Sequence, residues 1–292
     1  VLVDHVNSLR REGRSRVVLE NLRPSVDAGA FPAKRVLGET VEVQVDMFAD
    51  GHDRLSGVLR WWHEGDEARR ETPLLPEVND VWTASFPATR LGRYHFTVEG
   101  WVDRFETWRE RLRKKARAGQ DVEAAVELEI GAHVVAEAAE RAESGEDAVW
   151  LERRAAELNA EDATLEERVA LGLDEELRRV MARHPDRRFA TEFGGVRAID
   201  VDPRLAGFSA WYELFPRSCA PEPGKHGTLR DVIERLDYIE SMGFDVLYLP
   251  PVHPIGRTNR KGPNNMPGAR GEGPGSPWAI GGDEGGHDAI HP

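Results

Sequence analysis

The first third of the chain alternates apolar and polar residues with the period of a β-strand. The pattern is clearest in VEVQVDMF at 41–48 and in RYHFTVEGWV at 93–102. A period of two places one side of each strand in a core and the other side in water. Turn-forming residues separate the strands, as in ADGHD at 49–53 and EVND at 77–80. Such strands predict an antiparallel β-sandwich of immunoglobulin type. Its predicted inward face consists of Val41, Val43, Val45, Met47, Tyr94, Phe96 and Val98.

The next region has the period of amphipathic helices. In TLEERVALGLDEELRRVMARHP at 164–185, Thr164 and Glu167 fit a capping box, and Pro185 stands just past the end of the pattern. Two upstream stretches, 121–142 and 148–158, are also rich in strong helix formers. Apolar positions spaced three and four residues apart mark the buried side of the last helix; they are Leu177, Val180 and Met181.

These patterns predict a helical bundle at 113–185. We expect the bundle to be inserted into a sandwich that spans 16–112 and about 186–205, after an N-terminal tail at 1–15. The segment at 121–180 holds 18 Asp or Glu and 6 Arg, a net charge of −12 out of −13 for the chain. Such a concentration of acid is typical of a solvated helix face, although a binding surface for a cation or a basic partner is an alternative.

The last region predicts one β-α-β unit. An aromatic strand in SAWYELFPRS at 209–218 is followed by a helix in GTLRDVIERLDYIESMGF at 227–244, for which Thr228 and Asp231 form a capping box. The apolar run DVLYLPP at 245–251 is typical of a parallel strand that is covered on both sides. In parallel α/β folds the chemistry lies beyond the carboxyl ends of such strands. We therefore expect functional residues from Pro250 onward.

Composition narrows the classes of partner and location. A formal charge of −13 argues against a general nucleic-acid partner. The chain has no run of 18 apolar residues, so we expect no membrane-spanning helix. Its start has no small-residue cleavage site of the kind that follows a signal peptide. The single Cys219 has no partner for an internal disulfide, which favours a reducing, cytoplasmic setting. The tryptophans of the first region predict either core and interface packing, which we favour, or a sugar-stacking platform; they are Trp61, Trp62, Trp82, Trp101 and Trp108.

Three stretches carry a resemblance to a known family. WYELFPRS, MGFDVLYLPPVHPIGRTNRKGPNN and GSPWAIGGDEGGHDAIHP resemble the α-amylase family of (β/α)8-barrel enzymes. Within that family they look most like the maltose-1-phosphate maltosyltransferases. The resemblance implies an N-terminal β-sandwich that carries an inserted helical domain and contributes to a homodimer, ahead of the barrel. Residues 206–292 then form the first strands of the barrel, which remains incomplete in this chain.

The resemblance also implies a reaction. Members of the family transfer a maltosyl unit from α-maltose 1-phosphate to the non-reducing end of an α-1,4-glucan with retention. Retention requires two carboxylates about 5 Å apart. In the family the Asp nucleophile and Glu acid/base follow later barrel strands, so we expect them beyond Pro292 and assign no catalytic residue here. We expect the chain alone to be inactive. The alternatives are another α-amylase-family hydrolase or isomerase, or a non-catalytic carbohydrate-binding or dimerisation module.

Part of the donor site is implied within RKGPNN. By resemblance Lys261 contacts the maltosyl donor and Asn265 lies beside it, and their donors and acceptors suit sugar hydroxyls. The neighbouring Arg257 and Arg260 offer an alternative, binding of the donor phosphate. Pro263 stands where relatives often carry a basic residue, which bears on the conformation of the loop. Trp278 either packs under the sugar or anchors its loop. We expect no cofactor and no metal, because His253, His287 and His291 lack a recognised ligand spacing.

Overall fold

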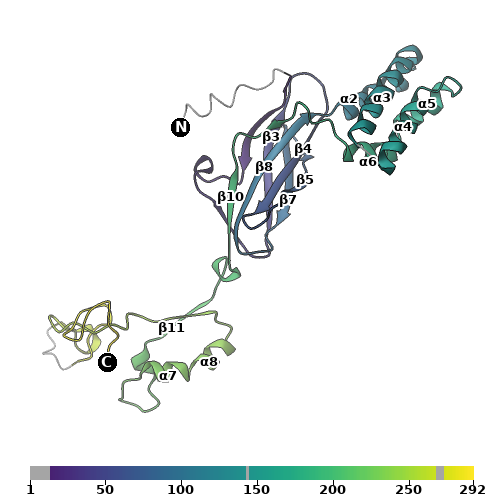
Figure 1. The fold of residues 1–292 in the computed structure, drawn as a ribbon. Coiled ribbons are helices and arrows are strands. Elements are labelled where there is room, and N and C mark those ends of the chain that lie inside the picture. Colours follow the sequence, from purple (N-terminus) through teal and green to yellow (C-terminus); the bar gives the residue numbers. More distant parts are fainter. Residues whose placement is uncertain (1–13, 143–144, 268–272) are drawn as a thin grey trace. The chain divides into compact units, whose positions relative to one another are not determined.

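The computed structural model describes residues 14–142, 145–267 and 273–292 (Figure 1). Most of the expected tail at 1–15 therefore lies outside the described residues. The chain divides into two compact units, 1–203 and 204–292, each with its own elements.

The first unit begins with two packed β-sheets. One sheet has the strand order β1-β3-β7-β6, and the other has the order β2-β10-β8-β4-β5, with the short strand β9 (Thr191–Glu192) beside β8. The strands of the first sheet are β1 (Val18–Arg23), β3 (Thr40–Phe48), β7 (Val81–Pro87) and β6 (Leu75–Pro76). Those of the second are β2 (Ala33–Val36), β10 (Arg197–Asp202), β8 (Gly92–Val102), β4 (Leu55–His63) and β5 (Arg70–Pro73).

The sandwich is antiparallel except at one pair of strands. β10 pairs with β8 in the antiparallel sense, but it pairs with β2 in the parallel sense, with Ile199 opposite Ala33. The predicted antiparallel arrangement is confirmed for the other strand pairs of the described sandwich, and this pair departs from it. A parallel pair needs a long crossover connection, and here strands β3 to β9 and the helical insertion lie between the two strands.

The alternating residues form the core of the sandwich, as predicted. Val41, Val43 and Val45 are fully buried, and so is Phe96. Trp61 stacks on Phe86 with ring centroids 4.9 Å apart. Trp101 and Trp108 are also buried, whereas Trp62 and Trp82 are half-buried. The burial of Trp61, Trp101 and Trp108 agrees with packing rather than with a sugar-stacking surface.

Five helices follow β8 before the chain returns to the sandwich (Figure 1). Asp103 caps the first of them, α2, by accepting a hydrogen bond from the Glu106 N–H. Because α2 continues to Arg117, the predicted boundary between sandwich and bundle at residue 112 falls inside this helix. The capping box predicted from Thr164 and Glu167 is present at the start of α5. The helices are α2 (Arg104–Arg117), α3 (Asp121–Arg141), α4 (Glu146–Leu158), α5 (Leu165–Gly172) and α6 (Glu175–Arg183). They share one hydrophobic core, which includes Leu112, Leu128, Leu151, Leu158, Leu177, Val180 and Met181.

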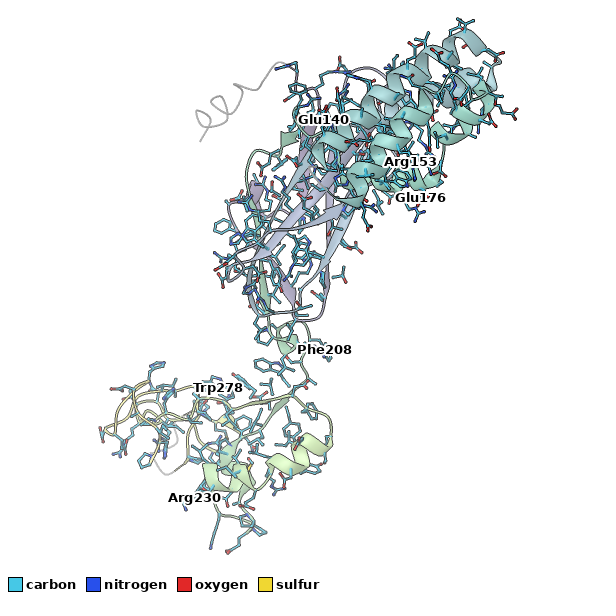
Figure 2. All side chains as sticks on the ribbon, turned by 45° about the vertical axis from the view of Figure 1, so that its right-hand side comes forward. Glu140, Arg153, Glu176, Phe208, Arg230 and Trp278 are labelled. Carbon is cyan, nitrogen blue, oxygen red and sulfur yellow. The ribbon has the colours of Figure 1, made fainter. Side chains whose placement is uncertain are left out.

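Many charged side chains of the bundle lie on its outer surface, whereas Arg109 and Glu127 are buried. Figure 2 shows Glu140, Arg153 and Glu176 projecting away from the helices, and all three are exposed. Among the described residues, no helix is both long and apolar enough to cross a membrane.

The second unit contains the predicted parallel pair of strands. β11 (Trp211–Glu213) pairs with β12 (Val246–Tyr248) in the parallel sense, and no closed barrel is present in the described part. The capping box of Thr228 and Asp231 is present. The prediction of one continuous helix is wrong, because the segment forms two short helices, α7 (Leu229–Ile233) and α8 (Leu236–Ser241). The Arg235 N–H donates to the Val232 carbonyl, a tighter turn than in an α-helix, and this bond separates the two pieces.

The strand expected to be covered on both sides is largely open. Tyr248 is 42% exposed, and Val246 and Leu247 are half-buried. The two helical pieces are also largely open, because Val232 and Ile239 are buried whereas Leu229, Ile233 and Leu236 are exposed.

Candidate functional site

The segment after β12 folds back on the last residues of the chain. The Gly256 N–H donates to the Ala279 carbonyl at 2.6 Å, and the Gly281 N–H donates to the Pro254 carbonyl at 2.9 Å. Further along, the His291 N–H donates to the Val252 carbonyl at 2.8 Å. These backbone bonds hold residues 252–267 against residues 279–291. Residues 252–267 carry the predicted donor-binding side chains, and we call them the donor loop.

The three basic side chains of the donor loop have different environments. The Arg260 guanidinium donates to the carbonyls of Gly256, Gly273 and Ile255 at 2.8–3.2 Å, so it ties the loop together. Arg257 forms ion pairs with Asp283 at 3.1 Å and Glu284 at 3.6 Å on the surface. Lys261 is half-buried and makes no hydrogen bond or ion pair with the described residues. Of the three, Lys261 is the cation left available for a ligand.

Lys261 lies just before a tight turn, and Asn265 is the last residue of that turn. The Met266 N–H donates to the Pro263 carbonyl at 3.2 Å and closes a 3-10 turn over Pro263–Asn265, and the Gly262 N–H donates to the Met266 carbonyl at 2.9 Å across the same turn. Pro263 occupies the first position of that turn, where a missing N–H costs nothing. Asn265 is exposed in a left-handed conformation with φ of 59°, which asparagine tolerates well. The turn therefore accommodates the proline and leaves the Asn265 amide accessible.

The aromatic residue Trp278 contacts the end of the first strand segment. Its ring lies edge-on to Phe215 at 5.8 Å between centroids, and 57% of its surface is exposed. Nearby, Arg217 donates to the Gly275 carbonyl at 2.9 Å. The Phe215 contact holds one edge of Trp278, and the rest of the ring is exposed.

The histidines of this region are held by the backbone and by each other. His253 Nδ1 lies 2.9 Å from the Ala289 carbonyl, and the rings of His253 and His287 are 5.4 Å apart. In the described part of the chain, no group of three or more His, Cys, Asp or Glu side chains is arranged to hold a metal ion.

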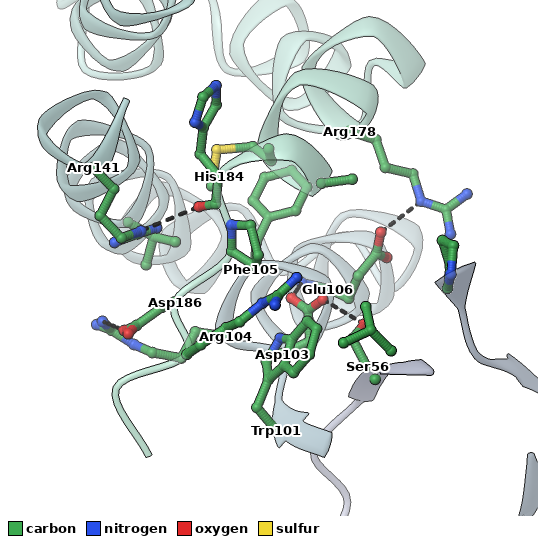
Figure 3. A pocket seen from close by; sticks show the side chains of 18 of the residues that line it. Ser56, Trp101, Asp103, Arg104, Phe105, Glu106, Arg141, Arg178, His184 and Asp186 are labelled. Atoms are coloured by element: carbon green, nitrogen blue, oxygen red, sulfur yellow. Dashed lines mark hydrogen bonds and ion pairs between the residues drawn. The ribbon is translucent and has the colours of Figure 1, made fainter. Parts of the chain in front are cut away.

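The first unit contains a cavity that the sequence did not indicate. It has a volume of about 180 Å³ and lies where the ends of the sandwich strands meet α2, α3 and α6 (Figure 3). Ser56 donates to Asp103, Arg178 donates to Glu106, and Arg141 donates to the His184 carbonyl across its walls. Burial raises the pKa of Asp103, whereas two arginines hold the pKa of Asp186 far below its usual range. The cavity is lined by groups that bind one another, so we interpret it as the junction that fixes the bundle to the sandwich.

Asp186 is the carboxylate on which this junction depends most. It accepts two bonds from the Arg188 guanidinium, at 2.7 and 2.9 Å, and one from Arg104 at 3.1 Å, and its side chain is 9% exposed. The pKa of Asp186 is lower in the folded than in the unfolded state, so its charge adds to the free energy of unfolding. This contribution is complete above pH ~4 and is lost as the pH falls through the folded-state pKa. We expect Asp186→Asn to lower the free energy of unfolding by about 1 kcal/mol at pH 7.

Urea denaturation of both proteins from pH 7 to pH 2 measures this difference. The gap between wild type and Asp186→Asn should narrow below pH 4, since the wild-type carboxylate becomes protonated. Asp50→Asn is the matched control, because Asp50 also pairs with an arginine, Arg16, but its side chain is 80% exposed. A gap that stays constant with pH would contradict the role given to the Asp186 charge.

Comparison with known proteins gives a consistent match. Residues 15–203 match the family model described as alpha-1,4-glucan:maltose-1-phosphate maltosyltransferase, domain N/S. The chain is 46% identical over 283 residues to the enzyme of that name from Chlorobaculum tepidum, covering 96% of this chain and 41% of the relative. It is 43% identical to the one from Methylacidiphilum infernorum and 42% identical to the one from Pseudomonas aeruginosa, over 96% and 95% of this chain and 41% of each relative. The chain thus spans about two fifths of the length of these curated relatives.

Proposed function

Because the chain belongs to the alpha-1,4-glucan:maltose-1-phosphate maltosyltransferase family, we propose that it is the N-terminal part of an enzyme with that activity. In this proposal the full-length protein transfers a maltosyl unit from α-maltose 1-phosphate to the non-reducing end of an α-1,4-glucan. The Asp nucleophile and the Glu acid/base that retention requires come from the part of the enzyme after residue 292. The protein works as a homodimer in the reducing cytoplasm.

One observation carries the proposal. The similarity to the Chlorobaculum tepidum relative extends over 96% of this chain, so it continues well past residue 203, where the family-model match ends. It therefore covers most of the second unit, which contains the donor loop, as well as the sandwich and bundle. A shared accessory domain alone does not account for a match of that extent.

The donor loop has a defined part in the proposed reaction. Lys261 and Asn265 bind hydroxyls of the maltosyl unit, since the first is a cation that no described residue pairs and the second offers both a donor and an acceptor. Arg260 keeps the loop in shape through its three carbonyl contacts. Such pre-positioned groups lower the entropic cost of holding the donor for transfer.

Phosphate release from α-maltose 1-phosphate tests the proposal. The full-length protein should release inorganic phosphate when glycogen is present as acceptor, and the chain of residues 1–292 should release none. Starch hydrolysis without phosphate release would instead identify a hydrolase of the α-amylase family. Retention of the 1–292 chain on a glucan gel, with no activity of the full-length protein, would identify a binding module.

A further inference from the structure

A groove on the sandwich has a charge opposite to that of the protein. It measures about 660 Å³ and is lined from β1 and β3 of one sheet, from β2 and the start of β10 of the other, and from the loop after β1. Three arginines, Arg23, Arg35 and Arg197, line it together with one carboxylate, Glu42. The net charge of the lining is therefore +2, whereas the chain carries −13.

The arginines of this groove lack the ion pairs that other arginines of the sandwich make. Arg60 pairs with Glu99 at 2.9 Å and Arg93 pairs with Asp200 at 2.8 Å. By contrast, the side chains of Arg23 and Arg197 form no hydrogen bond or ion pair with any residue that the structure describes. Arg35 donates only to the carbonyl of its neighbour Lys34. Unpaired guanidinium groups that share one groove are ready to bind an anion.

Arg197 is held in place without being neutralised. Its guanidinium lies over the Phe193 ring at 5.0 Å and against the backbone of Gly29, where an added Cβ would come within 2.5 Å of Nη1. Its Nε is buried without a partner, and burial lowers the pKa of the group. Gly29 has a φ of 93°, so both its conformation and this contact favour glycine. The chain therefore fixes a half-buried cation at the wall of the groove.

The local structure of β1 directs a second arginine to the same place. The pairing of β1 with β3 shifts register between Glu20 and Arg23, which is a β-bulge. Bulges re-aim side chains and are common beside binding sites. Asn21 lies in the bulge with a φ of 53°, and its amide nitrogen donates to Asp46, which leaves its carbonyl oxygen to accept.

The other lining residues suit a sugar. Gln44 offers an amide donor and an acceptor, and Asn21 offers an acceptor, which match hydroxyl groups. Pro24 and Phe193, both half-buried, provide apolar surface. The volume falls in the range of small-ligand sites, and the acidity of the rest of the chain disfavours a long polyanion. We propose that this groove binds a small sugar phosphate, with the phosphate on Arg197 and Arg23 and the sugar on the amides of Gln44 and Asn21.

Calorimetric titration of the full chain with glucose 1-phosphate, inorganic phosphate and glucose at low ionic strength tests the proposal. We expect glucose 1-phosphate to bind with one-to-one stoichiometry, inorganic phosphate to bind more weakly, and glucose to give no measurable heat. Arg197→Gln should lower the affinity for glucose 1-phosphate at least ~10-fold, since the substitution removes a charge-assisted contact. Arg93→Gln, which removes a paired arginine outside the groove, should change the affinity less than ~2-fold.

Two further variants separate the groove from misfolding and from the donor loop. Glu42→Gln removes the one carboxylate among the described lining residues. It should raise the affinity for glucose 1-phosphate by about 2- to 5-fold. Lys261→Ala should leave this binding unchanged, because Lys261 belongs to the other unit. The proposal is overturned if glucose 1-phosphate binds no more tightly than inorganic phosphate. It is also overturned if Glu42→Gln lowers the affinity for glucose 1-phosphate. It is equally overturned if binding survives in Arg197→Gln and disappears in Lys261→Ala, a result that would leave the proposed function intact.

Discussion

Replacing Trp108 by alanine is expected to lower the free energy of unfolding of the first unit by about 3–5 kcal/mol. Trp108 is 2% exposed, and its indole N–H donates to the Glu127 carbonyl at 2.6 Å. Its ring lies against Gly131 of α3 and at 5.4 Å from Phe105. The substitution removes a large buried ring and leaves the Glu127 carbonyl without that donor. Urea denaturation followed by circular dichroism measures the loss.

A double-mutant cycle with Gly131 shows whether the ring contact is the cause. A Cβ on Gly131 would overlap the Trp108 indole, so Gly131→Ala should destabilise the wild type by about 1–3 kcal/mol. Alanine is otherwise favoured over glycine within a helix by about 1 kcal/mol. In the Trp108→Ala background the same substitution should therefore become stabilising. If it remained equally destabilising there, the packing of Trp108 on Gly131 could not explain the glycine.

The largest expected effect on activity belongs to Lys261. In the full-length protein, Lys261→Ala should reduce kcat/KM for α-maltose 1-phosphate by about 10- to 100-fold, since a hydrogen bond from a charged donor contributes about 1.5–3 kcal/mol. Steady-state phosphate release measures the change. Replacing the side chain removes the one cation of the donor loop that no described residue pairs.

Arg257→Ala is the matched control, because Arg257 lies four residues away in the same loop but pairs with Asp283 and Glu284 at the surface. It should alter kcat/KM less than ~2-fold. A larger loss for Arg257→Ala than for Lys261→Ala would move the donor contact to Arg257 and contradict the assignment.

Features set by neighbours in the sequence were predictable. The alternation at 41–48 and 93–102 identified the buried faces, and Thr164 and Thr228 identified two helix starts. Asp103 could also have been recognised, because an aspartate directly before a helix is a preferred cap. These features depend on spacing within one element, which the sequence displays directly.

Features set by distant residues were not predictable in the same way. The parallel pairing of β10 with β2 and the contact of Trp108 with Gly131 join residues that only the folded chain brings together. The same is true of the groove, since Arg23, Arg35 and Arg197 come from three different strands. Each arginine alone looks like an ordinary surface residue in the sequence. Only the missing ion pairs and the shared cavity mark them as a group.

The length of the product chains tests the central claim most directly. The full-length protein is incubated with α-maltose 1-phosphate and a labelled maltohexaose, and the products are separated by length. Transfer of a maltosyl unit predicts products longer than the acceptor by two glucose residues, and then by four and six, with one phosphate released per addition. Products that grow by one residue, or an acceptor that only becomes shorter, would contradict the account.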